Sequence, residues 1–173
     1  MNDFEKLDKV SENKCYIDKV YSFENFITNE SNIEIFELLK NYPNMNMKYN
    51  PIVIEGIFGT GKTHLLNAFK NEHSDKYNIK IVECFDFSRD IMDNLIKKRM
   101  NTFLEEYDSA DILCIDNILF LAHRETTQEC LVEIIDKYIR NNKQVIVTTT
   151  LELSTGFSEM LKSKIYQGIK FTI

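Results

Sequence analysis

The sequence predicts an α/β domain in which a mainly parallel sheet of five strands is covered by helices on both faces. Short apolar runs that are typical of buried strands alternate with amphipathic helical segments along the chain. The strand runs do not alternate cleanly between apolar and polar residues, as expected when both faces of a sheet are buried. A glycine-rich turn joins the first strand to a helix, and polar residues end later strands. Sheets of this kind bind ligands at the carboxyl ends of their strands.

The individual elements are expected in a regular order. Ser31 with Glu34, and Thr126 with Glu129, form capping-box patterns that predict the starts of two helices. The helices are expected at 31–40, 64–71, 88–100 and 126–140, with a further helical piece near 103–104 and a loop at 41–50. The strands are expected at 51–55, 80–84, 111–116, 144–148 and 169–173. Residues 1–20 form a polar lead-in, so the predicted domain runs from 21 to 173.

Length and composition fit one globular domain. The 173 residues are 43% hydrophobic and include only five Gly and two Pro, so the chain can bury a full core and long flexible linkers are not expected. No apolar run approaches the length of about 18 residues that a membrane-spanning helix needs. The polar N-terminus excludes a secretory signal, and the cytoplasm is the expected compartment. The net charge of −6 argues against strong, non-specific DNA binding but leaves room for a local basic surface.

The four cysteines are expected to be reduced thiols. No two of them form a C-x-x-C pair, and no His lies at metal-ligand spacing from them. Cys84 and Cys114 lie in apolar, strand-like runs, so we expect both to fill the core.

One motif carries most of the functional prediction. Residues 56–63 match the phosphate-binding pattern G-x-x-x-x-G-K-[ST] at every fixed position, with an apolar strand before and a helix after. Glycines let backbone N–H groups approach phosphate oxygens, and the helix directs its positive end at the same place. We therefore expect ATP or ADP with Mg²⁺, held by Gly56, Ile57, Phe58, Gly59, Thr60, Gly61, Lys62, Thr63 and the following His64. Lys62 supplies a cation to the β- and γ-phosphates, and the Thr63 hydroxyl is a metal ligand.

A second acidic site is predicted at the end of the third strand. The apolar run 112–115 ends in Asp116, which a buried strand would carry to the sheet edge beside Thr63 and the metal. The alternative is a strand-end Asp that only caps a turn. Hydrolytic relatives usually place a second acid next, but here the residue is Asn117, and an amide cannot accept the proton of water. We expect slow hydrolysis or none.

Two further polar clusters have two interpretations each. Thr148, Thr149 and Thr150 end the fourth strand, where a hydroxyl can sense the γ-phosphate, although Thr also simply suits a strand. The basic run Lys97, Lys98 and Arg99 is either a solvated helix end or a nucleic-acid contact.

Several separated stretches follow the patterns of one family, which are given in parentheses: 21–26 (Y-x-F-x-N-F), 49–51 before the first strand, 59–66 (G-x-G-K-T-H-L-L), 111–121 (D-x-L-x-I-D-D-I-x-F-L), 127–129 (T-Q-E) and 143–144. Together these stretches resemble the AAA+ domain of the bacterial replication initiator DnaA. The resemblance runs from about Tyr21 to the C-terminus. Helicase loaders of the same clade share only the G-K-T-H-L part.

The resemblance implies a fold and a set of roles. The sheet would have the strand order 5-1-4-3-2 of an AAA+ base subdomain. Phe26 and Ile27 would lie beside the adenine, and Thr149 or Thr150 would be sensor 1. The helix with Lys97, Lys98 and Arg99 would fall in the initiator-specific insertion that engages single-stranded DNA. Arg124 falls where the family places a basic residue that touches the same strand.

The departures from the family pattern concern catalysis. Asn117 replaces the second acid, and Lys164 falls on the arginine finger, keeping its charge but losing its planar geometry. The sequence also ends before the family's small helical lid, either as a fragment or as a short relative.

The functions that these observations favour are three. The first is an ATP-binding switch in replication initiation that assembles head-to-tail with like AAA+ subunits or with the initiator. The second is an active ATPase of the helicase-loader or initiator type acting on single-stranded DNA. The third is a non-catalytic interaction module that modulates the initiator.

Overall fold

The computed structural model describes residues 21–43, 49–150, 153 and 155–173, so the polar lead-in and Cys15 lie outside the described residues. In the described part, five parallel strands form one sheet in the order β2-β3-β4-β1-β5. This is the predicted order 5-1-4-3-2 read from the other edge, so the fold class is confirmed. The strands are β1 (Ile52–Glu55), β2 (Ile79–Glu83), β3 (Ile112–Asp116), β4 (Gln144–Thr149) and β5 (Ile169–Thr172).

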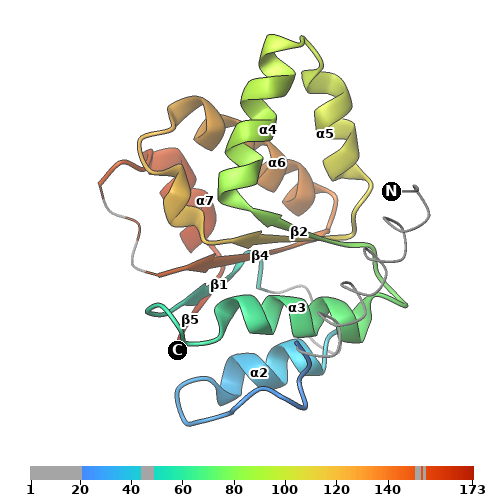
Figure 1. Ribbon diagram of the computed structural model, residues 1–173, viewed down its shortest axis with the longest axis vertical. Helices are drawn as coiled ribbons and strands as arrows, with labels where there is room; N and C mark the ends of the chain where they lie inside the picture. The colour runs from blue at the N-terminus through green and yellow to red at the C-terminus, as the bar shows by residue number, and fades with distance from the viewer. Residues whose placement is uncertain (1–20, 44–48, 151–152, 154) are drawn as a thin grey trace, which may run out of the picture.

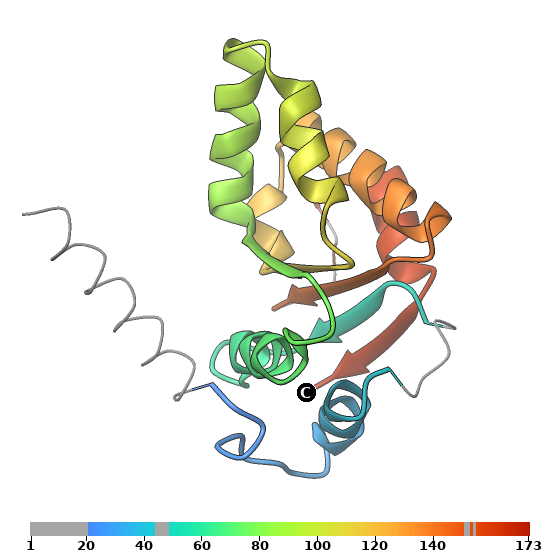
Figure 2. The ribbon, with the colours of Figure 1, turned by 90° about the vertical axis from the view of Figure 1, so that its right-hand side faces the viewer.

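Helices cover both faces of the sheet (Figure 1). One face packs against α2 (Ile33–Lys40) and α3 (Lys62–His73). The other face packs against α4 (Cys84–Ile96), α5 (Met100–Asp108), α6 (Glu125–Arg140) and α7 (Glu159–Tyr166). Figure 2 shows α4 and α5 projecting from the sheet as a helical hairpin. Among the described residues, no helix has the length and apolar character needed to cross a bilayer.

The central strands explain why the strand runs in the sequence lack alternation. Every residue of β3 and of β4 is buried, because helices pack against both faces of these strands. Cys114 in β3 and Cys84 at the start of α4 are fully buried free thiols, as expected of core fillers.

Two of the stretches that resemble the family contact each other at the amino ends of β1 and β4. The Asn50 side chain donates from Nδ2 to the Lys143 carbonyl (2.7 Å) and accepts the Val145 N–H at Oδ1 (2.9 Å). The Gln144 amide donates to the Tyr49 carbonyl (3.1 Å). These bonds hold the segment before β1 beside the start of β4. They give a structural reason for the family resemblance at 49–51 and 143–144.

Both predicted capping boxes are wrong. The first residue of α2 follows Asn32, whose side chain pairs with Asn29: Asn29 N donates to Asn32 Oδ1 (2.7 Å), and Asn29 Oδ1 accepts from Asn32 N (3.2 Å). This reciprocal turn takes the place of the Ser31 cap. Helix α6 begins at Glu125, which places Thr126 inside the first turn without a capping bond.

Other boundaries also differ from the predictions. Helix α4 starts directly after β2 rather than four residues later, and α5 is a full helix rather than a short piece. The sequence analysis missed the 3-10 turn η1 (Ile118–Leu121) and helix α7. A signal for α7 was present, because Ser158 caps it by accepting from Leu161 N (3.3 Å), and Leu161 and Ile165 share its buried side.

Gln128 ties the segment after β3 to the segment before α7. This fully buried side chain donates from Nε2 to the carbonyls of Leu121 (2.8 Å) and Gly156 (2.7 Å), and its Oε1 accepts the Ser158 N–H (2.8 Å). A single amide therefore satisfies three backbone groups from two connections, which accounts for Gln at the centre of the 127–129 stretch.

Replacing Gln128 with Ala is expected to destabilise the fold by about 3 kcal/mol, because three backbone groups lose their partner and a cavity is left. Equilibrium urea unfolding measures the change. Gln167→Ala, at an exposed position after α7, is the control and should change the stability by less than about 0.5 kcal/mol. Equal stability of both variants would contradict the role given to Gln128.

Candidate nucleotide-binding site

A cavity of about 420 Å³ lies at the carboxyl ends of the strands, where the motifs were expected to meet. Each strand from β1 to β4 contributes the residues that follow it. The lining residues are Tyr21, Phe58, Gly59, Gly61, Lys62, Thr63, His64, Glu83, Cys84, Asp116, Asn117, Phe120 and Thr150. Nine of these were predicted from the sequence as site residues, and the fold brings them together from three separate segments.

The glycine-rich turn between β1 and α3 has the backbone that a phosphate loop needs. Gly59 and Gly61 both have positive φ, 86° and 93°, which side-chain-bearing residues rarely adopt. No atom lies within 4 Å of the position that a Cβ on Gly59 would occupy, so the loop leaves open space there. A Cβ on Gly56 would lie 2.5 Å from the Ile173 carbonyl oxygen, so this glycine is required by close packing.

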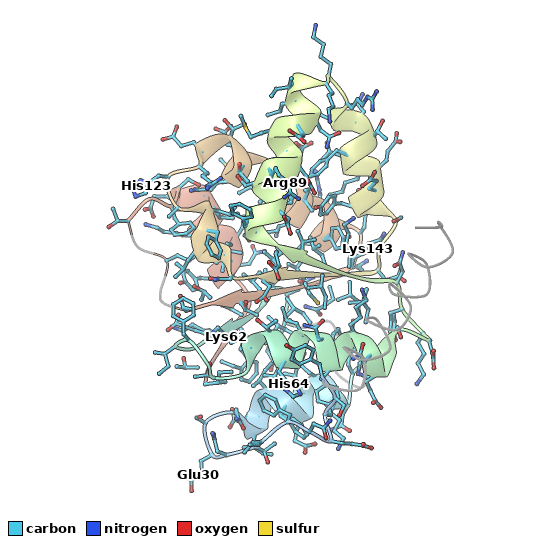
Figure 3. All side chains as sticks on the ribbon, in the orientation of Figure 1. Glu30, Lys62, His64, Arg89, His123 and Lys143 are labelled. Carbon is cyan, nitrogen blue, oxygen red and sulfur yellow. The ribbon has the colours of Figure 1, made fainter. Side chains whose placement is uncertain are left out.

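The Lys62 ammonium lies inside the loop. It donates to the carbonyls of Gly56 (2.6 Å) and Ile57 (2.8 Å), and Figure 3 shows it beside the turn at the start of α3. The Thr60 hydroxyl also donates to the Ile57 carbonyl (3.0 Å). Burial lowers the pKa of Lys62, while the negative charge of Asp116 acts in the opposite direction. A cation is thus held where the loop and the first turn of α3 meet.

Asp116 is a buried carboxylate held by hydroxyl groups from two elements. Thr63 Oγ1, on the first turn of α3, donates to Asp116 Oδ2 (2.7 Å). Thr148 Oγ1, in β4, donates to the other oxygen, Oδ1. Thr63 and Asp116 are the two predicted metal ligands, and the fold places their oxygens in contact at the edge of the cavity.

Asn117 leaves the strand in a left-handed conformation (φ 55°, ψ 66°), which Asn tolerates better than most residues. Its N–H donates to Thr148 Oγ1 (2.8 Å), and its side chain lines the cavity. Two buried oxygen atoms here, Asn117 Oδ1 and Thr150 Oγ1, have no hydrogen-bond partner among the residues that the structure describes. Both residues line the cavity, so both can bind a polar ligand there.

The three consecutive threonines at the end of β4 have different surroundings. The Thr148 side chain contacts Asp116, and the Thr149 carbonyl accepts the Gly56 N–H (3.1 Å). Only Thr150 lines the cavity. Of the two sensor candidates, the geometry therefore favours Thr150 over Thr149.

Aromatic side chains form the side of the site nearest α2. His64, on the first turn of α3 (Figure 3), donates from Nε2 to the Ser22 carbonyl (2.8 Å). Its ring makes T-shaped contacts with the rings of Tyr21 and Phe26, each at 5.2 Å between centroids. The Phe26 ring also covers Gly61, since a Cβ there would lie 2.7 Å from its Cε2 atom. Tyr21, not Phe26, lines the cavity. Ile27 is 86% exposed and does not line it.

The remaining predicted residues lie outside the cavity. Lys164, on α7, forms an ion pair with Asp136 of α6 (Nζ–Oδ1 2.6 Å). Lys97, Lys98 and Arg99 are exposed and form the turn between α4 and α5, rather than the end of a helix that runs to residue 100. Arg124 donates from Nη1 to Ser88 Oγ (2.7 Å).

Sequence reasoning missed four lining residues, Tyr21, Glu83, Cys84 and Phe120. Glu83 ends β2 and Cys84 follows it, so the rule that ligands bind at strand ends was a usable signal. Tyr21 and Phe120 belong to stretches that matched the family but had no residue role attached to them.

A family model described as the bacterial DnaA ATPase domain matches residues 17–172. The chain belongs to this family. The chromosomal replication initiator protein DnaA of Aquifex aeolicus (strain VF5) is 34% identical over 165 residues, which cover 93% of this chain and 41% of that protein. The AMPPCP-bound DnaA structure from Aquifex aeolicus superposes with a TM-score of 0.83 at 35% identity, covering 88% of this chain and 49% of that chain.

A second similar structure is a replication initiator DnaA bound to AMPPCP and single-stranded DNA, with a TM-score of 0.83 at 34% identity, covering 88% of this chain and 49% of that chain. The chain thus spans less than half the length of these DnaA relatives. Both of these DnaA structures hold the ATP analogue AMPPCP, and this chain has the same fold.

Proposed function

We propose that this chain is a DnaA-type AAA+ module that binds ATP or ADP with Mg²⁺, serves replication initiation or its regulation, and hydrolyses ATP slowly or not at all. One observation carries the proposal. The phosphate loop lines the same cavity as Thr63 and Asp116, whose side-chain oxygens are 2.7 Å apart, and the next lining residue, Asn117, has an amide side chain. We also propose the cytoplasm as its compartment.

The residues present fit a nucleotide with its metal. The open space at Gly59, the backbone N–H groups of the loop and the N-terminus of α3 suit a row of phosphates. Lys62 supplies a positive charge, and Thr63 with Asp116 supplies the oxygen ligands that Mg²⁺ prefers. When bound, Mg²⁺ neutralises phosphate charge. The buried, unpartnered Thr150 hydroxyl can donate to a terminal phosphate.

The proposed weakness of hydrolysis follows from Asn117. A general base must accept a proton from the attacking water, and an amide cannot do this at neutral pH. Its Nδ2 group can still donate a hydrogen bond to a phosphate oxygen or orient a water. The site is therefore built to hold a triphosphate, and an active ATPase of the helicase-loader or initiator type is the less favoured alternative.

Assembly with like subunits or with the initiator is part of this proposal. Lys164 does not line the cavity of its own chain and is held by Asp136, so any contact it makes to a nucleotide would be to that of a neighbouring subunit. This supports a head-to-tail arrangement. A non-catalytic module that modulates the initiator would use the same contact.

Lys62→Ala is expected to weaken ATP·Mg²⁺ binding about 10- to 100-fold, because a charge-assisted contact to the phosphates is lost. Calorimetric titrations with ATP and with ADP, each with Mg²⁺, measure the affinities. Lys70→Ala, near the end of the same helix, is the matched control and should bind as the wild type does. Absence of heat from the wild type up to millimolar nucleotide would disprove the nucleotide-binding proposal.

Asn117→Asp is expected to raise ATP turnover by about 10–100-fold, toward the range of general base catalysis, since Asp can take the water's proton. Asp also tolerates the left-handed backbone at this position, so the fold should be kept. Phosphate release is measured for the isolated chain and with a full-length initiator added. Asn117→Ala should give no gain. Robust hydrolysis by the wild type alone would contradict the proposal of a holding module.

A contact with single-stranded DNA is proposed for the tip of the α4–α5 hairpin. Lys97, Lys98 and Arg99 are all exposed there. Within the described part of the chain, Lys97 forms an exposed ion pair with Asp93 (3.9 Å), and the other two have no ion-pair partner. Figure 2 shows that this tip stands clear of the sheet, where a strand could approach it. The similar structure with bound single-stranded DNA supports the same ligand class.

Replacing Lys97, Lys98 and Arg99 together with Ala is expected to weaken binding of a labelled oligo(dT) and to lower the slope of log affinity against log salt by about 2, from three lost phosphate contacts. Fluorescence anisotropy at several salt concentrations, with ATP present, gives the slope. Alanine at Lys40, Lys76 and Lys170, which are exposed on other elements, removes the same charge and should change it less. Equal slopes for the two triple variants would contradict a localised contact.

A further inference from the structure

We infer that Thr148 is the positioning residue for the metal ligand Asp116 and for the backbone turn at Asn117; this inference rests on the proposed binding of a nucleotide with Mg²⁺. Thr148 lies in β4, touches no part of the cavity itself and is fully buried. Its hydroxyl forms hydrogen bonds with both Asp116 and Asn117, the two consecutive residues at the end of β3.

The groups involved determine which atom donates and which accepts in the two hydrogen bonds of Thr148. The backbone N–H of Asn117 can only donate, so Thr148 Oγ1 accepts it (2.8 Å). The single hydroxyl hydrogen is then free to be donated to Asp116 Oδ1. The hydroxyl thus uses its acceptor for Asn117 and its donor for Asp116, so one side chain fixes the orientation of the carboxylate and the path of the backbone after it.

The position of Thr148 in the sheet explains why a hydroxyl is needed. The paired register of β3 with β4 ends at Ile115 opposite Val147. One residue further, Asp116 must direct its carboxylate toward Thr63, and Asn117 must leave the strand with a φ of 55°. The Asn117 N–H bonds to the side chain of Thr148 rather than to a strand carbonyl, so the hydroxyl ends the ladder and guides the exit of the chain.

The two oxygens of Asp116 are divided between two partners. Oδ2 accepts from Thr63, the other predicted metal ligand, and Oδ1 accepts from Thr148. Since Thr63 is exposed at the cavity and Thr148 is buried behind Asp116, Thr148 can keep the carboxylate oriented while Thr63 and Oδ2 serve the metal. Partners of this kind, which hold a ligand by its second oxygen, affect metal affinity about 10- to 100-fold when they are removed.

Thr148→Val tests the inference, because it keeps the branched shape and removes the hydroxyl. The measured quantity is the gain in ATP affinity that Mg²⁺ gives, the ratio of the Kd in EDTA to the Kd with saturating Mg²⁺. We expect this ratio to fall about tenfold or more in Thr148→Val, with a smaller change in the Kd in EDTA. Thr148→Ser restores the hydroxyl and should recover the wild-type ratio to within about threefold.

Thr127→Val is the matched control. Thr127 is also a buried threonine, on α6, and its hydroxyl lies 3.4 Å from Ser88 Oγ and not in the cavity. The Thr127→Val variant should lose about as much stability in urea unfolding as Thr148→Val does. Its ratio of the Kd for ATP in EDTA to the Kd with Mg²⁺ should stay at the wild-type value. If Thr148→Val does not fold, Thr148→Ala takes its place, because it removes the hydroxyl and leaves no methyl group against the carboxylate.

Amide hydrogen exchange of Asn117 in the nucleotide-free protein gives a second readout that involves no ligand. Exchange should be faster in Thr148→Val than in the wild type or Thr148→Ser, since the acceptor of this N–H is lost. The inference would be overturned if Thr148→Val kept the wild-type ratio of the Kd in EDTA to the Kd with Mg²⁺. That outcome includes a loss of ATP affinity that is equal with and without Mg²⁺. A wild type that shows no gain from Mg²⁺ would instead overturn the proposed function, and the exchange rates would still decide the role of Thr148 at Asn117.

Discussion

The interaction on which the rest of the site depends is the burial of the Asp116 carboxylate at the end of β3. A buried charge is costly unless hydrogen bonds and opposite charge compensate it. Here the compensation comes from the Thr63 and Thr148 hydroxyls and from the nearby ammonium of Lys62. Lys62 and Thr63 open α3, directly after the glycine-rich turn that follows β1, and Thr148 lies in β4. Satisfying Asp116 therefore requires that β1, β3 and β4 lie side by side with their carboxyl ends at one edge.

The glycine-rich turn depends in turn on packing from elements distant in sequence. Gly56 is held between the Thr149 carbonyl and the end of β5, and Gly61 lies under the ring of Phe26. Phe26 stacks on Phe36 of α2 at 5.8 Å between centroids and meets His64 of α3 edge-on. The segment before α2 thus buttresses the start of α3, which places the helix N-terminus and Lys62 at the cavity. Removing α2 or the end of β5 would expose the turn whose backbone has to hold phosphates.

The sequence was sufficient for the sheet and for the core of the site, because both depend on short-range patterns. Apolar runs locate the strands, and the loop pattern and the Asp after β3 are each contiguous. What could not be predicted depends on contacts between segments. For Thr148 the sequence left two interpretations open, a γ-phosphate sensor or a residue that simply suits a strand, and only the structure shows its contact with Asp116 on the neighbouring strand. Likewise, the capping boxes failed because Asn29 and Asn32 offered a better local pairing.

The position of Phe26 and Tyr21 shows the same limit from another direction. The family resemblance placed the adenine beside Phe26 and Ile27, but it is Tyr21 that lines the cavity, and the Ile27 side chain is in solvent. A motif specifies which segment lies near a site. Which side chain of that segment faces the ligand is decided by packing against His64 and Phe36, which a one-dimensional pattern does not contain.

Asn117 shows how stability and catalysis oppose each other at this edge. An Asp there would place a second carboxylate directly after the buried Asp116, and like charges so close raise the cost of ionising both. The amide removes this repulsion, tolerates the left-handed turn and keeps a donor for phosphate oxygens. What an amide lacks is the ability to take a proton from water. A site with the Thr63–Asp116 pair, Lys62 and Thr150, but with an amide at residue 117, therefore fits the proposal of a module that holds a triphosphate and cleaves it slowly or not at all.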